Sequence, residues 1–170
     1  VRTHCSDDFL WLPFVTCRYV QSTGDREILD EPINFIKGRP VSEEEDSYYD
    51  LPGRFEQTAS LYDHCMLAIK RGIDRTGKHG LPLIGSGDWN DGMNMVGKNG
   101  KGESVWLAFF LYDVLMRFAE IASLHDDQPF AERCRQEAGK LRRHIEQHGW
   151  DGEWYLRAFF DDGSPLGSAS

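Results

Sequence analysis

The sequence lacks the features by which several classes of protein are recognised. No run of about 18 apolar residues occurs in it, which excludes an ordinary transmembrane helix. The four cysteines lie far apart and form no C-x-x-C pair, so a disulfide-dense secreted scaffold is excluded and a reducing compartment is expected. Basic residues are in the minority, with 19 Lys+Arg against 28 Asp+Glu and a net charge of −9, and no segment clusters them with aromatic residues. We therefore expect no binding to nucleic acid and no contact with an anionic membrane.

The chain also lacks an initiator methionine and a signal peptide. It begins VRTHCSDD, without the charged-then-apolar order of a secretion signal, and it ends in a stretch rich in turn residues. We expect it to be an excised part of a longer protein. Its content of 40% hydrophobic and 12% aromatic residues is typical of a folded chain, and its length of 170 residues suits a single core.

Apolar periodicity predicts a mostly helical chain, and the expected fold class is all-α. Strict period-two alternation is scarce, and only Ile33–Ile36 and Trp154–Phe160 are candidates for short strands. Ser104 is expected to cap the longest apolar helix, which should be largely buried. The helices are expected at residues 8–20, 25–29, 57–71, 104–122 and 130–148.

Two long irregular segments, residues 38–55 and 78–103, separate the predicted helices. Irregular segments of more than about 20 residues are uncommon in compact domains and are often binding or catalytic loops. The second segment carries seven glycines, which allow the backbone to approach a ligand closely. We therefore take residues 78–103 as the candidate functional loop.

Within this loop two carboxylates, Asp88 and Asp91, flank Trp89 and Asn90. An indole face and hydrogen-bonding side chains suit a sugar or phosphate site. An EF-hand is excluded because Gly92 stands where the fifth position needs an oxygen ligand, and no segment has P-loop spacing. From composition alone, a functional loop and a tight turn stabilised by Asx hydrogen bonds are equally good interpretations.

The histidines do not indicate a metal site. His144 and His148 lie four residues apart on a predicted helix, but no third ligand of suitable spacing accompanies them. We therefore expect no bound metal.

The order of residues carries more information than the composition. Residues 81–94 read LPLIGSGDWNDGMN and residues 102–107 read GESVWL, which together closely resemble the signature of the glycoside hydrolase family 94 phosphorylases. The segments RTHCSDDFLWLP at 2–13 and LYDHC at 61–65 resemble further blocks of that family, the second with Asp in place of Glu. The segment GRFEQT at 53–58 looks most like the C-terminal domain of cyclic β-1,2-glucan synthases and related phosphorylases.

The resemblance implies a role for several residues. Asp91 matches the general acid, Trp89 matches the tryptophan that lines the −1 sugar subsite, and Arg2 and Asp8 match the pair that holds hydroxyls of the −1 glucosyl unit. Without the motif, Arg2 and Asp8 would be read as a surface ion pair at a helix start, and Trp89 as a core or loop anchor. The motif also contains three residues to which we assign no contact: Asp88, Asn90 and Glu103.

The resemblance further implies an (α/α)6 barrel, of which residues 1–170 would be an N-terminal part with long loops at the catalytic mouth. The implied reaction is inverting phosphorolysis of β-linked, most simply β-1,2-linked, glucooligosaccharides to α-glucose 1-phosphate. Inorganic phosphate is the co-substrate, and no other cofactor is expected. An inverting glucoside hydrolase and a carbohydrate-binding or structural fragment without turnover are the alternatives.

The resemblance also bears on location and partners. It implies a cytoplasmic domain, whose parent would be an inner-membrane protein if it is a cyclic glucan synthase. An incomplete barrel exposes apolar helix faces, so we expect self-association or contact with the remainder of the parent barrel.

Overall fold

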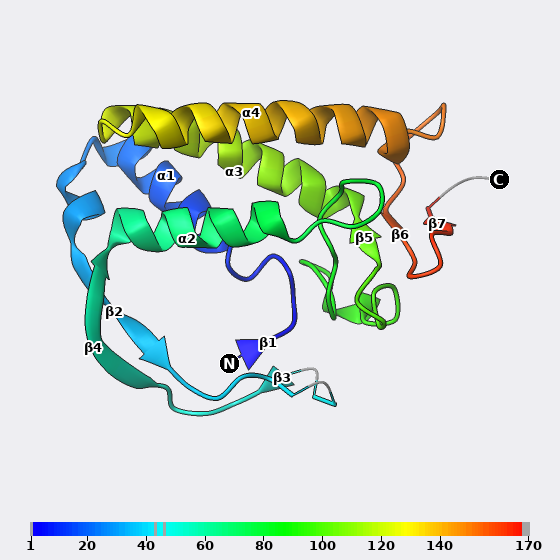
Figure 1. Cartoon of the computed structure of the whole chain (residues 1–170), viewed down its shortest axis with the longest axis horizontal. Helices are drawn as coiled ribbons and strands as arrows, with labels where there is room; N and C mark the ends of the chain where they lie inside the picture. The colour runs from blue at the N-terminus through cyan, green and yellow to red at the C-terminus, as the bar shows by residue number, and fades with distance from the viewer. Residues whose placement is uncertain (1, 43, 46, 168–170) are drawn as a thin grey trace.

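The computed structural model describes residues 2–42, 44–45 and 47–167, and the side chain of Asp91 lies outside this description. Helices and strands are interspersed along the chain (Figure 1). The helices are α1 (Trp11–Thr23), η1 (Glu27–Asp30), α2 (Leu61–Asp74), η2 (Asp91–Met93), α3 (Val105–Leu124), α4 (Gln128–His144) and η3 (Ile145–Gly149). The strands are β1 (Arg2–Thr3), β2 (Pro32–Lys37), β3 (Ser47–Tyr48), β4 (Gly53–Ser60), β5 (Glu103–Ser104), β6 (Ala158–Phe159) and β7 (Pro165–Leu166).

The α-helices share one hydrophobic core, with α3 in contact with each of the other three (Figure 1). Phe118 of α3 is completely buried, and its ring centroid lies 5.4 Å from that of Tyr62 on α2 and 5.9 Å from that of Phe130 on α4. The predicted burial of this helix is thus confirmed. Within the described ranges, none of the helices combines the length and apolarity that crossing a bilayer requires.

Capping residues decide where the helices begin. The Ser104 hydroxyl accepts a hydrogen bond from the Leu107 N–H at 2.9 Å, as predicted, and α3 follows it directly. The helix predicted from residue 57 begins later, because Ser60 is the actual cap and accepts the Asp63 N–H at 3.0 Å. The other predicted helices are confirmed with shifted ends.

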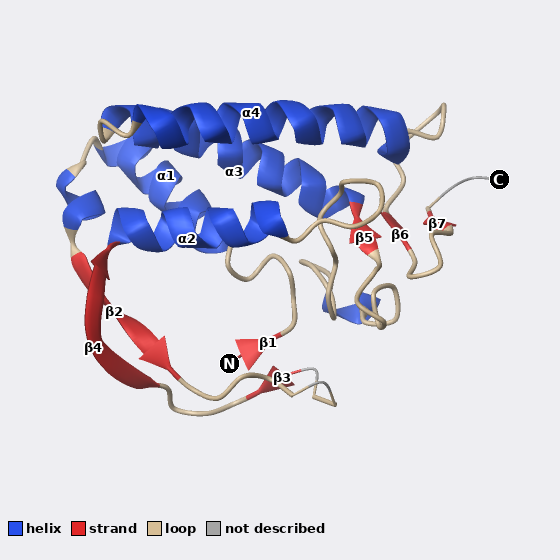
Figure 2. Cartoon of the chain, in the orientation of Figure 1, coloured by secondary structure: helices blue, strands red, loops and turns tan. Residues whose placement is uncertain are grey.

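The expected all-α fold class is wrong, because the described residues also form three small antiparallel sheets (Figure 2). Strands β2 and β4 make a curved ribbon, β1 pairs with β3, and β5, β6 and β7 make the third sheet. The strand predicted at Ile33–Ile36 is confirmed within β2, whereas only Ala158–Phe159 of the segment Trp154–Phe160 is a strand. The chain is a mixed structure, not a purely helical part of a barrel.

The physical reason for this error lies in exposure and strand length. Residues 53–58 of β4 are all exposed, so no apolar face marks this strand in the sequence. The other missed strands are two residues long, and β1, β3 and β5 pair with segments that are distant along the chain. Local alternation carries no signal for such pairs.

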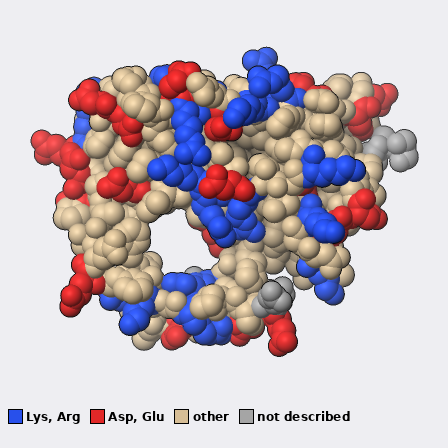
Figure 3. Space-filling view, viewed as in Figure 1, with Lys and Arg blue, Asp and Glu red and all other residues tan. Residues whose placement is uncertain are grey.

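The β2/β4 ribbon curves away from the helices and returns towards β1 (Figure 1). Arg2 closes this connection, because its guanidinium donates to the Arg39 carbonyl at 3.2 Å and to the Ile36 carbonyl at 3.4 Å. The space-filling view shows an opening between the ribbon and the helices, with Lys and Arg side chains at its rim (Figure 3).

Candidate active site

The N-terminal motif and the loop between α2 and α3 lie side by side, although more than 70 residues separate them in the chain. The Ser6 N–H donates to the Gly87 carbonyl at 2.9 Å, and the Ser6 hydroxyl donates to the same oxygen at 3.1 Å. Cys5 and Gly85 form an antiparallel bridge beside them. The two segments that the sequence singled out are therefore joined by backbone pairing.

Gly85 permits this close approach, and its replacement gives a testable prediction. Its φ is +65°, and a Cβ would lie 2.2 Å from the His4 carbonyl oxygen. Gly100 has a similar φ of +76° but open space around it, so Gly100→Ala is a matched control. We expect Gly100→Ala to cost about 1–2 kcal/mol of unfolding free energy from the left-handed backbone alone. Gly85→Ala should cost about 1–3 kcal/mol more, because the segments must separate. Denaturant unfolding of both variants measures the difference, and equal losses would contradict the close contact.

Asp88 is the buried centre of the loop. Its side chain is completely buried, and its Oδ1 lies 2.6 Å from Arg157 Nη2 and accepts the Asn90 N–H at 3.1 Å. Its Oδ2 accepts the Ser104 hydroxyl at 2.6 Å. Both carboxylate oxygens are thus satisfied by three separate donors.

These contacts decide the ionisation of Asp88. Burial by itself raises the pKa of this carboxyl, but the hydrogen bonds from Arg157, Ser104 and the Asn90 N–H outweigh burial and lower the pKa below 3.8. Asp88 is therefore ionised at neutral pH and does not donate a proton to a substrate. Its charge is balanced by Arg157, and no pattern in the sequence indicates this ion pair.

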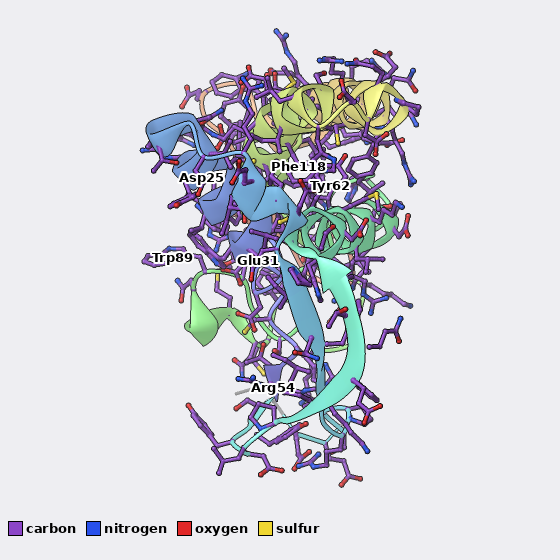
Figure 4. The ribbon with its side chains drawn as sticks, turned by 90° about the vertical axis from the view of Figure 1, so that its left-hand side faces the viewer. Asp25, Glu31, Arg54, Tyr62, Trp89 and Phe118 are labelled. Atoms are coloured by element: carbon purple, nitrogen blue, oxygen red, sulfur yellow. The ribbon has the colours of Figure 1, made fainter. Side chains whose placement is uncertain are left out.

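The turn after Asp88 carries Trp89, Asn90 and Asp91. The Asn90 Oδ1 accepts the Gly92 N–H at 3.1 Å, so the Asx turn considered from composition does occur here. The backbone of Asp91 begins η2 directly after it. Trp89 is 66% exposed and projects away from the ribbon (Figure 4), which excludes the interpretation as a core anchor.

Arg2 and Asp8 are placed at the N-terminal motif but are not paired with each other among the described side chains. Asp8 is exposed and accepts a hydrogen bond from the Thr3 hydroxyl, while Arg2 binds the carbonyls of the ribbon. Arg2 also lines a cavity of about 300 Å³ together with Tyr48 and Leu51. The ion-pair interpretation of Arg2 and Asp8 is therefore wrong.

Asp7 is a site residue that sequence reasoning missed. Its side chain is 5% exposed, and its Oδ2 accepts the Trp11 indole N–H at 2.8 Å. Burial raises the pKa of this carboxyl, the Trp11 hydrogen bond opposes the rise, and the carboxylates of Asp8 and Asp88 add to it. The four-residue spacing from Asp7 to Trp11 at a helix start was the available signal.

The raised pKa of Asp7 predicts a pH-dependent stability. A carboxyl whose folded pKa lies above its unfolded value binds more protons in the native state, so this contribution to stability falls as the pH rises. It is complete below about pH 3.8 and is lost as the pH passes through the raised folded pKa. Asp7→Asn removes the ionisation but keeps an acceptor for Trp11. We expect the stability of the variant relative to wild type to increase from pH 3 to pH 7. Urea unfolding at several pH values measures this, and a constant difference would contradict it.

Glu103, which the sequence left without a contact, is 2% exposed and has a structural role. Its Oε2 lies 2.6 Å from His79 Nδ1, and its Oε1 accepts the His79 N–H at 3.0 Å and the Leu81 N–H at 3.1 Å. A buried acceptor with these donors holds the turn that leads into the functional loop.

The two helix-end histidines are engaged with neighbouring segments. His144 Nδ1 lies 3.1 Å from the Gly80 carbonyl oxygen, and the His148 ring centroid lies 5.1 Å from that of His79. In the part of the chain that the structure describes, no three His, Cys, Asp or Glu side chains gather so that they could hold a metal ion.

Comparisons with known proteins give the family context. Residues 1–170 match the family model described as the Glycosyl hydrolase 94 superfamily, catalytic domain. The chain is 44% identical over 170 residues to the cyclic beta-(1,2)-glucan synthase NdvB of Rhizobium meliloti, covering 99% of the chain and 6% of that protein. It is 31% identical over 164 residues to the solabiose phosphorylase of Paenibacillus borealis, covering 96% of the chain and 19% of the relative. It is 29% identical over 170 residues to the N,N'-diacetylchitobiose phosphorylase of Vibrio furnissii, covering 99% of the chain and 18% of the relative.

The chain thus spans less than a fifth of the length of each of these relatives. The family match nevertheless covers every residue, including both segments that pair beside Asp88. The carbohydrate-active class expected from the motifs is confirmed, and the chain belongs to the glycosyl hydrolase 94 superfamily.

Proposed function

We propose that this chain forms part of the sugar site of an inverting phosphorylase that cleaves β-linked glucooligosaccharides with inorganic phosphate. The observation that carries the proposal is the pairing of Ser6 with Gly87, because it brings the motif of Arg2 and Asp8 to the loop that begins η2 at Asp91. The phosphorylase names among the matched relatives support the reaction class. The match to a cyclic beta-(1,2)-glucan synthase supports a β-1,2 linkage.

The proposed chemistry needs one acid from the protein. A phosphate oxygen attacks the anomeric carbon from the face opposite the leaving sugar, and the glycosidic C–O bond breaks as the new C–O bond forms. Asp91 gives its proton to the leaving oxygen, so the products are α-glucose 1-phosphate and an oligosaccharide shortened by one unit. A hydrolase of the same stereochemistry also needs a base to activate water, whereas phosphate is already an anionic nucleophile.

The remaining site residues would bind the sugar. The exposed indole of Trp89 offers a flat apolar face for a pyranose ring at subsite −1. Arg2 supplies donors and Asp8 supplies acceptors for hydroxyls of the same glucosyl unit. Phosphate is the co-substrate of the proposal, which includes no metal and no further cofactor.

The deciding experiment incubates the protein with a β-1,2-glucooligosaccharide, with and without phosphate, and quantifies α-glucose 1-phosphate and free glucose. The proposal predicts glucose 1-phosphate only when phosphate is present. Free glucose formed irrespective of phosphate would replace the proposal with an inverting hydrolase. Sugar binding without either product would indicate a carbohydrate-binding segment. Because the chain spans less than a fifth of its relatives, the assay is run on the chain and on the longer protein that we propose contains it.

We also propose that a partner covers the outer face of α1. Four large apolar side chains of this helix are between 38% and 58% exposed. A group of exposed apolar side chains on one helix is more typical of a contact surface than a single exposed hydrophobic residue is. Self-association of the chain, or docking of further parts of the parent protein, would cover them. Light scattering tests self-association. A monomer at all concentrations would leave only the remainder of the parent protein as the partner. The side chains are Trp11, Leu12, Val15 and Tyr19.

A further inference from the structure

A residue far from the loop in sequence holds the loop in place. Arg157 precedes β6, and its backbone is fixed on both sides: its N–H donates to the Leu166 carbonyl at 2.8 Å, and its carbonyl accepts the Val105 N–H at 3.2 Å. The small sheet of β5, β6 and β7 therefore sets the position of Arg157 at the start of α3.

The Arg157 guanidinium joins two other segments. Nη2 lies 2.6 Å from Asp88 Oδ1, and Nη1 donates to the Ser104 hydroxyl oxygen at 3.3 Å. Ser104 in turn donates to Asp88 Oδ2 and caps α3 through the Leu107 N–H. Burying a carboxylate completely costs free energy of folding unless a positive charge is paired with it. Arg157 is the cation that lies in contact with Asp88, and its side chain is only 27% exposed.

The contact extends from Asp88 to the backbone of Asp91. The same Asp88 oxygen that pairs with Arg157 accepts the Asn90 N–H at 3.1 Å, and Asn90 Oδ1 accepts the Gly92 N–H at 3.1 Å. These two hydrogen bonds flank the first residue of η2, which is Asp91. The orientation of the turn therefore depends on a carboxylate that Arg157 holds.

We infer that Arg157 is a positioning residue of the proposed phosphorylase: acting through Asp88, it holds the 88–92 turn so that Asp91 is presented to the leaving oxygen of the substrate. The inference rests on the proposed function only in its last step. It predicts a larger loss in the rate of the chemical step than in ground-state sugar binding, because Arg2 and Asp8 are not bonded to Arg157 in the described structure, and of the residues proposed to bind sugar only Trp89 lies in the turn.

The test compares Arg157→Gln, Arg157→Lys and the matched control Arg143→Gln, which changes an exposed arginine of α4. Removal of the guanidinium should lower kcat for phosphorolysis by about 100-fold, the loss typical of a misplacement near 1 Å, and raise KM by a clearly smaller factor, since Trp89 lies in the same turn. Arg157→Lys should recover part of kcat, because the lysine ammonium keeps the positive charge. It lacks the planar guanidinium that contacts Asp88 and Ser104 at the same time. Arg143→Gln should match wild type.

Amide hydrogen exchange at Asn90 and Gly92 gives a second readout that needs no activity. Both amides should exchange faster in Arg157→Gln, less so in Arg157→Lys, and normally in Arg143→Gln. If Arg157→Gln does not fold, the Arg157→Lys comparison decides: wild-type kcat together with wild-type exchange at both amides would overturn the inference. A folded Arg157→Gln with those same wild-type values would overturn it equally. If wild type releases no glucose 1-phosphate, the proposed function fails. The positioning contact is still tested by amide exchange in Arg157→Gln: faster exchange supports the contact, and unchanged exchange contradicts it.

Discussion

Asp91→Asn is expected to slow phosphate-dependent formation of α-glucose 1-phosphate severely while leaving sugar binding nearly unchanged. Asparagine has the size and hydrogen-bonding capacity of the aspartic acid but no proton to give to the leaving oxygen. Loss of a general acid typically lowers the rate by a factor of about 10²–10⁴. The measurement is kcat for phosphorolysis beside the dissociation constant of the oligosaccharide. An effect on kcat alone identifies the missing proton, because a residue that binds substrate and transition state equally changes KM instead.

A matched control separates this chemistry from a general effect of removing a carboxylate. Asp74 is an exposed residue at the end of α2, and its nearest cation, Arg133, lies 4.0 Å away. Asp74→Asn should retain the wild-type rate, because surface ion pairs contribute little to stability. Full phosphorolysis by Asp91→Asn would show that another group protonates the leaving oxygen.

Phe118→Ala is expected to cause the largest loss of stability of any single substitution considered for this chain. Phe118 has no solvent exposure and contacts the rings of Tyr62 and Phe130, so three helices meet at one side chain (Figure 4 labels Phe118 and Tyr62). Truncation of a buried phenylalanine leaves a cavity and costs about 3–5 kcal/mol. Denaturant unfolding followed by circular dichroism measures the change in unfolding free energy.

Phe109 supplies the control, because it lies on the same helix and is 40% exposed. Its ring contacts Tyr155 rather than the centre of the core. Phe109→Ala should cost clearly less than Phe118→Ala, since part of its apolar surface already faces water. Equal losses for the two variants would contradict the placement of Phe118 at the centre of the helical core.

The helices and the family could be predicted from the sequence because both signals are local. The apolar repeat along α3 and the Ser104 cap are contained in adjacent turns, and the structure confirms them. The loop motif around Asp88 is contiguous, so its order alone was enough to place the chain in its family, as the family match confirms. The roles assigned to Arg2, Asp8 and Asp91 stay predictions for the experiments above.

Tertiary structure decided the features that depend on distant partners. The sheet strands were missed because β4 is exposed and the shortest strands are defined only by pairing. The Asp88–Arg157 ion pair spans 69 residues, and the contact of Ser6 with Gly87 spans 81. No periodicity or motif spacing contains such contacts, because they form only when the packed helices bring remote loops together. The sequence by itself therefore determined the helices, the family and the identity of the loop, whereas the fold decided that Asp88 in this loop is buried, ionised and held by Arg157.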